Sequence, residues 1–319
     1  MNRKSISFLC ITFCTLLHAS DNSSLDKHLK KIKAQDKIGY TGIKNIDFIY
    51  MINLDKRPEK FKLSLGQLAP YNIIPFRFSA VNGWEKPLKE IAELGVKYTP
   101  DMADIVSQAQ IKGGLWGTYY LEHDGWHHEP ISTPNRNYFC HKMSRGPIGI
   151  LLSHLSILKD AYDSGYKIIW VMEDDIRVIQ NPHIISSLIE ELNRAVGTNN
   201  WDILFTDQDT KNNKGEYIIC RSYAPRPNFS PAQPEKFAAP PYNVTSNIRK
   251  ITARYGAYSM VISRAGMKKL LDFFRRYNLF LPYDMDFCMP NDIQLYAVTK
   301  DIVSTIPNAL SDNRIPRYL

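Results

Sequence analysis

Apolar and polar residues alternate in blocks along this chain, and the blocks predict strands and helices in turn. The continuous apolar run at residues 168–172 is typical of a strand buried on both faces, and the mainly apolar stretches at residues 46–54, 73–81 and 201–206 also predict strands. Leu151, Leu155 and Leu158 repeat at helical spacing and predict a helix over residues 147–162. Further helices are predicted to begin near Pro58, Pro182 and Ser263. This order favours an α/β fold with a mixed, mostly parallel sheet flanked by helices.

Two long segments break the pattern and predict insertions into a single domain of residues 46–319. Residues 84–145 are rich in Tyr, Trp, Gly and His and predict an irregular lid or acceptor-binding loop. The four histidines of this segment could form a zinc site or lie on a polar surface loop, and the lack of a structural zinc spacing favours the loop. Residues 210–250 contain six prolines and predict a semi-rigid loop that runs over the surface.

The N-terminal residues 1–20 place Arg3 and Lys4 ahead of an apolar stretch that ends in small residues. That layout is typical of a secretory signal peptide and is short for a membrane span. It predicts the secretory pathway or the cell envelope, with either a cleaved signal or a short anchor. The lysine-rich residues 21–45 predict a polar tether outside the core.

The composition is that of a globular protein, with 44% hydrophobic and 23% charged residues among 319. The formal net charge is +8, but basic and acidic residues are interspersed, and no zinc-finger, RNP-like or basic heptad pattern occurs. We therefore expect no nucleic-acid partner, whereas an anionic small substrate or an anionic membrane surface fits the charge. Cys140, Cys220 and Cys288 follow the signal-like segment, and one disulfide or three free thiols remain open.

The apolar strand at 168–172 runs directly into Glu173, Asp174 and Asp175. Ligands of an open α/β sheet bind outside the carboxyl ends of its strands, so this acidic cluster lies where a metal-assisted site is expected. A bound divalent cation would relieve the repulsion between the carboxylates, although a solvated acidic turn is the alternative. If the strand persists, Glu173 and Asp175 point to one side and Asp174 to the other.

A second polar cluster follows the first strand, where the turn into the next helix carries Asn53, Asp55, Lys56 and Arg57. A corner between a strand end and a helix start suits a nucleotide or a phosphate. The alternative is a capped helix with two exposed basic residues.

Five short motifs occur in order along the chain: INLDKRPE at 52–59, SAVNG at 79–83, GPIGILLSHLS at 146–156, VMEDD at 171–175 and a Gly, Ile-Ser and Gly pattern over 255–271. Together they resemble glycosyltransferase family 25, which contains bacterial lipooligosaccharide galactosyltransferases and the collagen galactosyltransferases. The resemblance covers about residues 46–290.

This resemblance implies a GT-A-like fold, a UDP-sugar donor, an inverting transfer and Mn²⁺ or Mg²⁺ held by Glu173 and Asp175. Galactose is the family's common donor sugar, and the acceptor is a saccharide, a lipooligosaccharide or a glycoprotein. Asp284 matches the family's late Pro-x-Asp segment as an acceptor-binding residue or general base, and Asp286 is the alternative catalytic carboxylate. The residues expected to bind the nucleotide sugar are Asn53, Leu54, Asp55, Arg57, Ala80, Asn82, Gly83, Ser153, His154 and Asp174.

Two other functions remain open from the sequence. A catalytically inactive, secreted or surface binding homologue would keep the fold without turnover, and the signal-like N-terminus gives this alternative weight. A metal-dependent phosphoesterase could use the same carboxylates, but it is expected to show further His or Asp ligands near them.

Overall fold

The computed structural model describes residues 24–37, 42–109, 114–212 and 214–306. The predicted signal segment, residues 1–20, lies outside these ranges. A central sheet has eight strands in the order β10-β11-β13-β9-β12-β7-β1-β2. Its strands are β1 (Phe48–Asn53), β2 (Phe76–Ser79), β7 (Ile168–Glu173), β9 (Ile203–Phe205), β10 (Tyr242–Asn243), β11 (Ile248–Ile251), β12 (Ser259–Ser263) and β13 (Leu295–Val298).

The sheet is mixed, as predicted, but it is not mostly parallel. The pairs β2-β1, β1-β7 and β9-β13 are parallel, and the other four are antiparallel. Strand β12 begins at the edge where β9 ends, and there the hydroxyl of Tyr258, just before β12, donates to Asp207 Oδ2, just after β9, at 2.5 Å. No sequence pattern encodes this contact between residues 51 positions apart.

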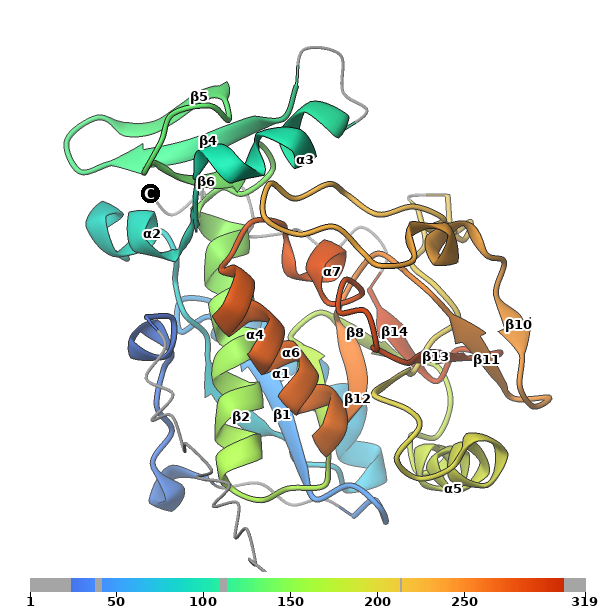
Figure 1. Cartoon of the computed structure of the whole chain (residues 1–319). Helices are drawn as coiled ribbons and strands as arrows, with labels where there is room; N and C mark the ends of the chain where they lie inside the picture. Colours follow the sequence, from blue (N-terminus) through green and yellow to red (C-terminus); the bar gives the residue numbers. More distant parts are fainter. Residues whose placement is uncertain (1–23, 38–41, 110–113, 213, 307–319) are drawn as a thin grey trace, which may run out of the picture.

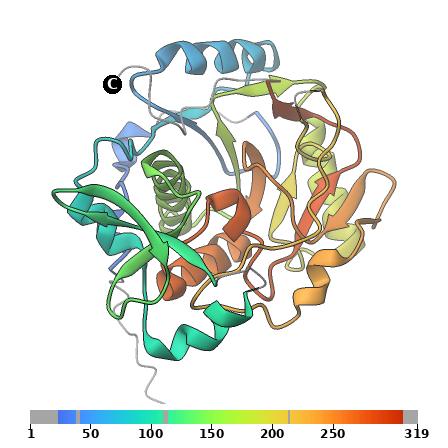
Figure 2. The same cartoon turned by 90° about the horizontal axis from the view of Figure 1, so that it is seen from above.

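Helices cover both faces of the sheet, which gives three layers (Figures 1 and 2). On one face, α4 (Arg145–Asp163) and α6 (Arg264–Tyr277) pack on Tyr50 and Ile52, which point to the same side of β1. On the other face, α1 (Pro58–Leu68) and α5 (Ile184–Val196) pack on Ile49 and Met51. Burial on both faces explains the continuous apolar run of β1. The predicted α/β fold is confirmed and is consistent with a GT-A-like architecture.

The helix boundaries follow local signals in the sequence. Pro58 is the first residue of α1, where its missing N–H costs no hydrogen bond. The Ser263 hydroxyl caps α6 by accepting from the Gly266 N–H at 3.2 Å. The short helix α7 (Tyr283–Asp286) occupies the segment that contains Asp284. Strands β8 (Ile176–Val178) and β14 (Val303–Thr305) form a separate antiparallel pair.

The segment 84–145 is a folded subdomain and not the irregular loop that its composition predicts (Figure 1). It contains α2 (Leu88–Leu94), η4 (Pro100–Met102) and α3 (Ala103–Gln108). Its four-stranded sheet has the order β3-β6-β4-β5. The strands are β3 (Val96–Lys97), β4 (Trp116–Leu121), β5 (Gly125–Pro130) and β6 (Asn137–Cys140). Strands β4 and β5 are partly exposed and contain polar residues, so they lack the apolar runs from which strands were predicted.

The lysine-rich N-terminal segment packs on the domain in its described part and is not a tether outside the core. Leu25 and Leu29, which flank η1 (Asp26–His28), are buried in the same apolar cluster as α4 and α6. Asp26 accepts two hydrogen bonds from Arg275 of α6, at 2.8 and 3.0 Å. A second turn, η2 (Ala34–Asp36), follows. Two leucines among many lysines were too weak a pattern to predict this packing.

The proline-rich segment 210–250 contains only η5 (Pro234–Ala238), β10 and the start of β11 among its described residues. Its Arg226 side chain is fully buried, and the guanidinium donates to Asp286 Oδ2 at 2.7 Å and to two backbone carbonyls at the end of α6. The segment is therefore anchored into the core and does not only run over the surface.

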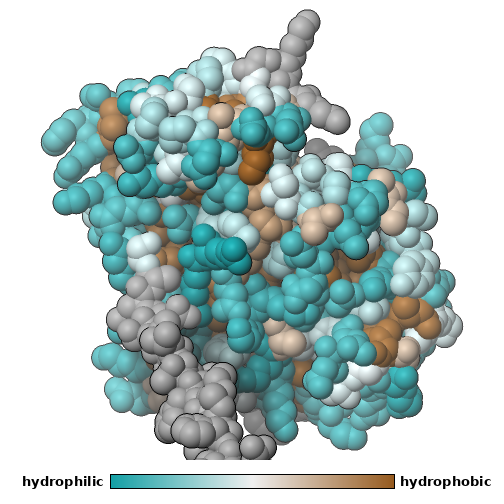
Figure 3. Space-filling model, in the orientation of Figure 1, coloured by the Kyte–Doolittle hydropathy of each residue, from teal (hydrophilic) through white to brown (hydrophobic). Residues whose placement is uncertain are grey.

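The face of the molecule in Figure 3 is mainly hydrophilic, with apolar residues in small separate patches. In the described part of the chain, no helix is both long and apolar enough to cross a membrane.

Candidate functional site

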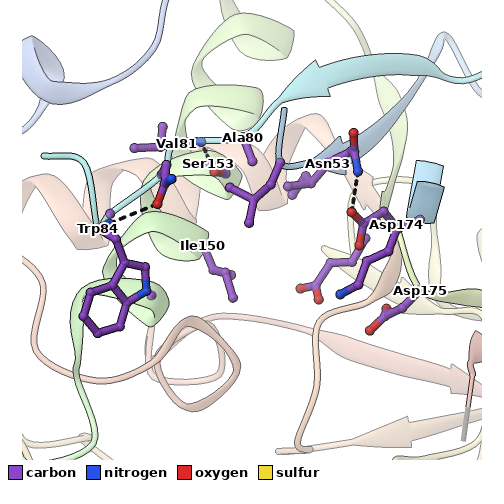
Figure 4. Close-up of a pocket in the computed structure, with 15 residues that line it drawn as sticks. Asn53, Ala80, Val81, Trp84, Ile150, Ser153, Asp174 and Asp175 are labelled. Atoms are coloured by element: carbon purple, nitrogen blue, oxygen red, sulfur yellow. Dashed lines mark hydrogen bonds between the residues drawn. The ribbon is translucent and has the colours of Figure 1, made fainter. Parts of the chain in front are cut away.

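A pocket lies at the edge of the sheet where the parallel strands β1, β2 and β7 end. Asn53 is the last residue of β1 and pairs with Ser79 of β2, while Glu173 ends β7 beside Ile52. The loop after β2 and the helix α4 form the opposite wall (Figure 4). Residues that line this first pocket include Asn53, Ala80, Val81, Trp84, Ile150, Ser153, Asp174 and Asp175.

Asn53 connects three parts of the pocket through its buried amide. Its Nδ2 donates to Asp174 Oδ2 at 2.6 Å and to the backbone carbonyl of Arg57 at 2.7 Å (Figure 4). Its Oδ1 accepts from Arg77 Nε at 2.7 Å. The structure thus places Asn53 and Asp174 in contact, as expected for two residues of one site.

Asp175 of the acidic cluster has a strongly shifted pKa. Burial and the neighbouring Glu173 and Asp174 charges together raise its pKa to about 7, against the opposing charge of Lys60. Its Oδ1 is buried and has no hydrogen-bond partner. A buried carboxylate oxygen without a partner is costly, and a divalent cation would satisfy it. The donor set therefore fits the predicted metal.

Among the described residues, no three His, Cys, Asp or Glu side chains form a group that could hold a metal ion on their own. Mg²⁺ in phosphate-transfer sites is commonly held by one or two carboxylates, with water and substrate phosphates completing the shell. Two carboxylates are therefore sufficient for a cation that binds together with a diphosphate. The histidines of the 84–145 subdomain likewise form no metal group in the described structure.

The side chain of Glu173 is contacted by a histidine of α4. The Nε2 of His154 lies 3.2 Å from Glu173 Oε1, and His154 is only 1% exposed. The imidazole stacks on the Tyr283 ring of α7, with ring centroids 4.2 Å apart. His154 was predicted to bind the nucleotide sugar, but it is buried behind Glu173 and can act on a ligand only through that carboxylate.

The loop after β2 packs against α4 through two glycines. A Cβ atom on Gly149 would lie 2.5 Å from the Val81 carbonyl oxygen, and one on Gly83 would lie 1.8 Å from the Arg145 carbonyl oxygen. The Ser153 hydroxyl accepts from the Val81 N–H at 2.8 Å and donates to the Gly149 carbonyl. The glycines and the serine of these motifs therefore fix the backbone that forms one wall of the pocket.

A second cavity opens on the other side of Glu173. It is lined by Lys142, Ser144, Pro147, Ile150, Glu173, Gly256, Ala257, Tyr258, Pro282, Tyr283, Asp284 and Met285. Glu173 and Ile150 line both this cavity and the first pocket. Two ligands bound in the two cavities would therefore meet at Glu173.

The structure separates the two predicted catalytic carboxylates. Asp284 lines the second cavity, its Oδ2 accepts from the Gly256 N–H at 3.0 Å, and burial raises its pKa. Asp286 is 0% exposed and its Oδ2 is ion-paired with Arg226 at 2.7 Å. A group without access to a ligand cannot take a proton from it, so the structure favours Asp284 over Asp286, and the catalytic assignment stays a prediction.

The remaining predicted residues fall into two groups. Leu54, Asn82 and Gly83 line the first pocket, and Leu54, Asn82 and Asp55 line an adjoining cavity. The Arg57 side chain instead pairs with Glu59, at 2.5 Å between Nε and Oε1, and lines none of these cavities.

Sequence reasoning missed two residues of the first pocket. Lys60 lies in the first turn of α1, one turn beyond the polar corner that was singled out. Trp84 follows the Asn-Gly turn, and its buried Nε1 has no hydrogen-bond partner. A polar residue on the first turn of the helix, and an aromatic residue beside the turn, were the signals that could have identified them.

Comparison with known proteins decides the family. Residues 46–289 match the family described as glycosyltransferase family 25 (LPS biosynthesis protein), which is most of the chain. The chain belongs to glycosyltransferase family 25. The family resemblance predicted from the five motifs is thereby confirmed.

Several family 25 proteins are similar to this chain at low identity. A Drosophila melanogaster protein named Glycosyltransferase 25 family member is 26% identical over 179 residues, which is 56% of this chain and 23% of that protein. An Aedes aegypti protein of the same name is 25% identical over 189 residues, 59% of this chain and 24% of that protein. The human protein named Inactive glycosyltransferase 25 family member 3 is 24% identical over 189 residues, which is 59% of this chain and 25% of that protein. The matches span about a quarter of these relatives.

Proposed function

We propose that this family 25 chain transfers a hexose from a UDP-sugar to a hydroxyl group of a saccharide or glycoconjugate, with inversion and with Mn²⁺ or Mg²⁺. Galactose is the first sugar to test, because it is the family's common donor. The observation that carries the proposal is the position of Glu173, which lines both the pocket with Asp174 and Asp175 and the cavity with Asp284. A transferase needs such a junction between donor and acceptor.

The first pocket supplies the groups that a nucleoside diphosphate needs. Glu173 and Asp175 would hold the divalent cation, whose charge offsets the negative charge that develops on the departing diphosphate. The hydrogen bond between Asn53 and Asp174 fixes the floor of the pocket. Trp84 offers a flat ring and an unpartnered Nε1 donor on the opposite wall.

The second cavity supplies a base. In an inverting transfer, one carboxylate takes the proton of the acceptor hydroxyl while its oxygen attacks the sugar from the face opposite the leaving group. Asp284 fits this role because it lines the cavity and its pKa is raised by burial, which strengthens it as a base. The Gly256 N–H holds the Asp284 carboxylate in place and leaves its other oxygen available to the acceptor.

A second candidate function is a binding protein that has lost turnover, and the name of the human relative supports it. The complete carboxylate set of this chain, Glu173, Asp175 and Asp284, favours an enzyme. A phosphoesterase is disfavoured, because the described residues contain no additional His or Asp ligand group. We further propose the secretory pathway or the cell envelope as the location, with possible contact to a membrane surface, on the basis of residues 1–20.

The test is the release of UDP from a panel of UDP-sugars with and without Mn²⁺, followed by NMR of the product's anomeric configuration. Release that requires Mn²⁺, and a product of inverted configuration, are the expected results. Binding of UDP without release from any sugar would establish the inactive homologue. Phosphate release from a simple phosphate ester would establish the phosphoesterase.

A further inference from the structure

The β4–β5 hairpin projects from the body of the molecule, and its two faces differ (Figures 1 and 2). One face is filled by its own side chains. Tyr119 stacks on His127 with ring centroids 5.1 Å apart, and the Arg136 guanidinium lies 4.1 Å from the Tyr119 centroid. That face has no ring left for a ligand.

The opposite face of the hairpin carries exposed aromatic rings on both strands, although Thr118 and Tyr120 in its middle are buried. Residues 116, 118 and 120 of β4 share this face with their cross-strand partners 130, 128 and 126 of β5. Trp126 is 67% exposed and Trp116 is 41% exposed. The His128 ring lies 5.5 Å from the Trp116 ring and is oriented by Thr118, whose hydroxyl is 3.2 Å from Nδ1.

This face is joined through the chain to the wall of the cavity that contains Asp284. The His128 and His141 rings are 6.2 Å apart, and His141 is followed directly by Lys142, which lines that cavity. We call Trp116, Trp126, His128 and His141 the aromatic face. Its connection to the wall of the second cavity points to a ligand that extends out of the cavity.

We propose that the aromatic face binds the sugar residues of an oligosaccharide acceptor that lie beyond the sugar whose hydroxyl reacts. The inference rests on the proposed function, since it extends the acceptor cavity. One side of a pyranose ring carries C–H groups that pack on the electron-rich face of an aromatic ring. Its hydroxyls remain free to bond to the two imidazoles. Exposed tryptophans separated by polar residues suit such a ligand.

A polypeptide is the other occupant to weigh, because β5 is an edge strand that could pair with an added strand. Two features oppose this. Pro130 at the end of β5 has no N–H to donate, and proline on an edge strand discourages pairing. The polar His128 ring also breaks the apolar surface that a peptide side chain would need. The aromatic face therefore favours a saccharide.

The test measures binding of the full chain, with UDP and Mn²⁺, to an array of saccharides of one to six sugar residues and of denatured, unglycosylated polypeptides. The variants are Trp116→Ala and Trp126→Ala. Tyr242→Ala, an exposed aromatic residue 58% accessible on β10 at the edge of the central sheet, is the matched control. Melting temperatures of all three are compared with the parent chain.

We expect the parent chain to bind a saccharide of three or more residues, with roughly fivefold or greater loss in each tryptophan variant and none in Tyr242→Ala. Three results would overturn the inference: no saccharide binding by the parent chain, equal saccharide binding by the parent and the tryptophan variants, or a loss of binding only for polypeptides. UDP release without acceptor is measured in parallel. If saccharide binding depends on the tryptophans but no UDP is released, only the proposed transferase activity is refuted. If UDP is released but saccharide binding does not depend on the tryptophans, only the role of the aromatic face is refuted.

Discussion

The Nε2 of His154 lies 3.2 Å from Oε1 of Glu173, and the same imidazole stacks on Tyr283, one residue before Asp284. One buried ring thus contacts the carboxylate shared by the two cavities and the helix that carries the proposed base. In metal sites, mutation of a group that orients a metal ligand typically lowers metal affinity or activity by about 10- to 100-fold.

The first prediction concerns this contact. His154→Ala should raise the Mn²⁺ concentration needed for half-maximal UDP release by about tenfold, because Glu173 loses its orienting partner. His154→Gln keeps a polar group near Glu173 and should recover part of the loss. A Mn²⁺ titration of UDP release measures both. A change in the maximal rate alone, with the Mn²⁺ midpoint unchanged in both variants, would show that His154 does not position Glu173.

The second prediction concerns Asp175, whose pKa is about 7 in the folded chain. The folded state binds this proton more tightly than the unfolded state, so the contribution of Asp175 to stability is fully present below about pH 4 and is lost as the pH rises through about 7. Asp175→Asn removes that loss and should melt at least about 2 °C higher than the parent at pH 8. The two should not differ at pH 4. Thermal unfolding across this pH range measures the effect.

The same variant should lose Mn²⁺-dependent UDP release, and Mn²⁺ should no longer raise its melting temperature. Asp175→Ala is expected to lose release as well without unfolding. Full activity in either variant at unchanged thermal stability would exclude Asp175 as a metal ligand.

The third prediction separates Asp284 from Asp286. Asp284→Asn should lower the turnover number by about 10²- to 10⁴-fold with little change in stability, since a positioned base contributes that much. Asp286→Asn leaves the buried Arg226 without its counter-charge and should cost about 3 kcal/mol of unfolding free energy. Urea unfolding and steady-state kinetics distinguish the two. A stable and inactive Asp286→Asn, with an active Asp284→Asn, would reverse the assignment.

The fourth prediction tests the wall formed by α4 and the loop after β2. Gly149→Ala forces a methyl group against the Val81 carbonyl and should destabilise the fold by about 1–3 kcal/mol while raising the KM for the UDP-sugar. Gly66→Ala is the matched control, because nothing lies within 4 Å of its Cβ position on α1. That control should stabilise the helix by about 0.5–1 kcal/mol with an unchanged KM. Equal effects of the two substitutions would contradict the close packing.

Some of this architecture follows from the sequence, because strands buried on both faces leave long apolar runs. That signal predicted β1 and β7 and placed Asn53 and Glu173 at one edge of the sheet. The antiparallel direction of β12, which brings Tyr258 to Asp207, is encoded by no local pattern. The roles of Asp284 and Asp286 could not be distinguished either, since the partner of Asp286 is Arg226, 60 positions earlier.

The small sheet of residues 84–145 is bonded through the backbone to the segment that leads into α7. The Leu279 N–H donates to the Leu94 carbonyl at 3.0 Å, and the Cys140 N–H donates to the Phe280 carbonyl at 2.9 Å. These bonds tie the region that contains the hairpin to the segment that precedes the proposed base. With sugars bound on the aromatic face as proposed, the separation between Trp126 and Asp284 would decide which sugar along the acceptor chain receives the new residue.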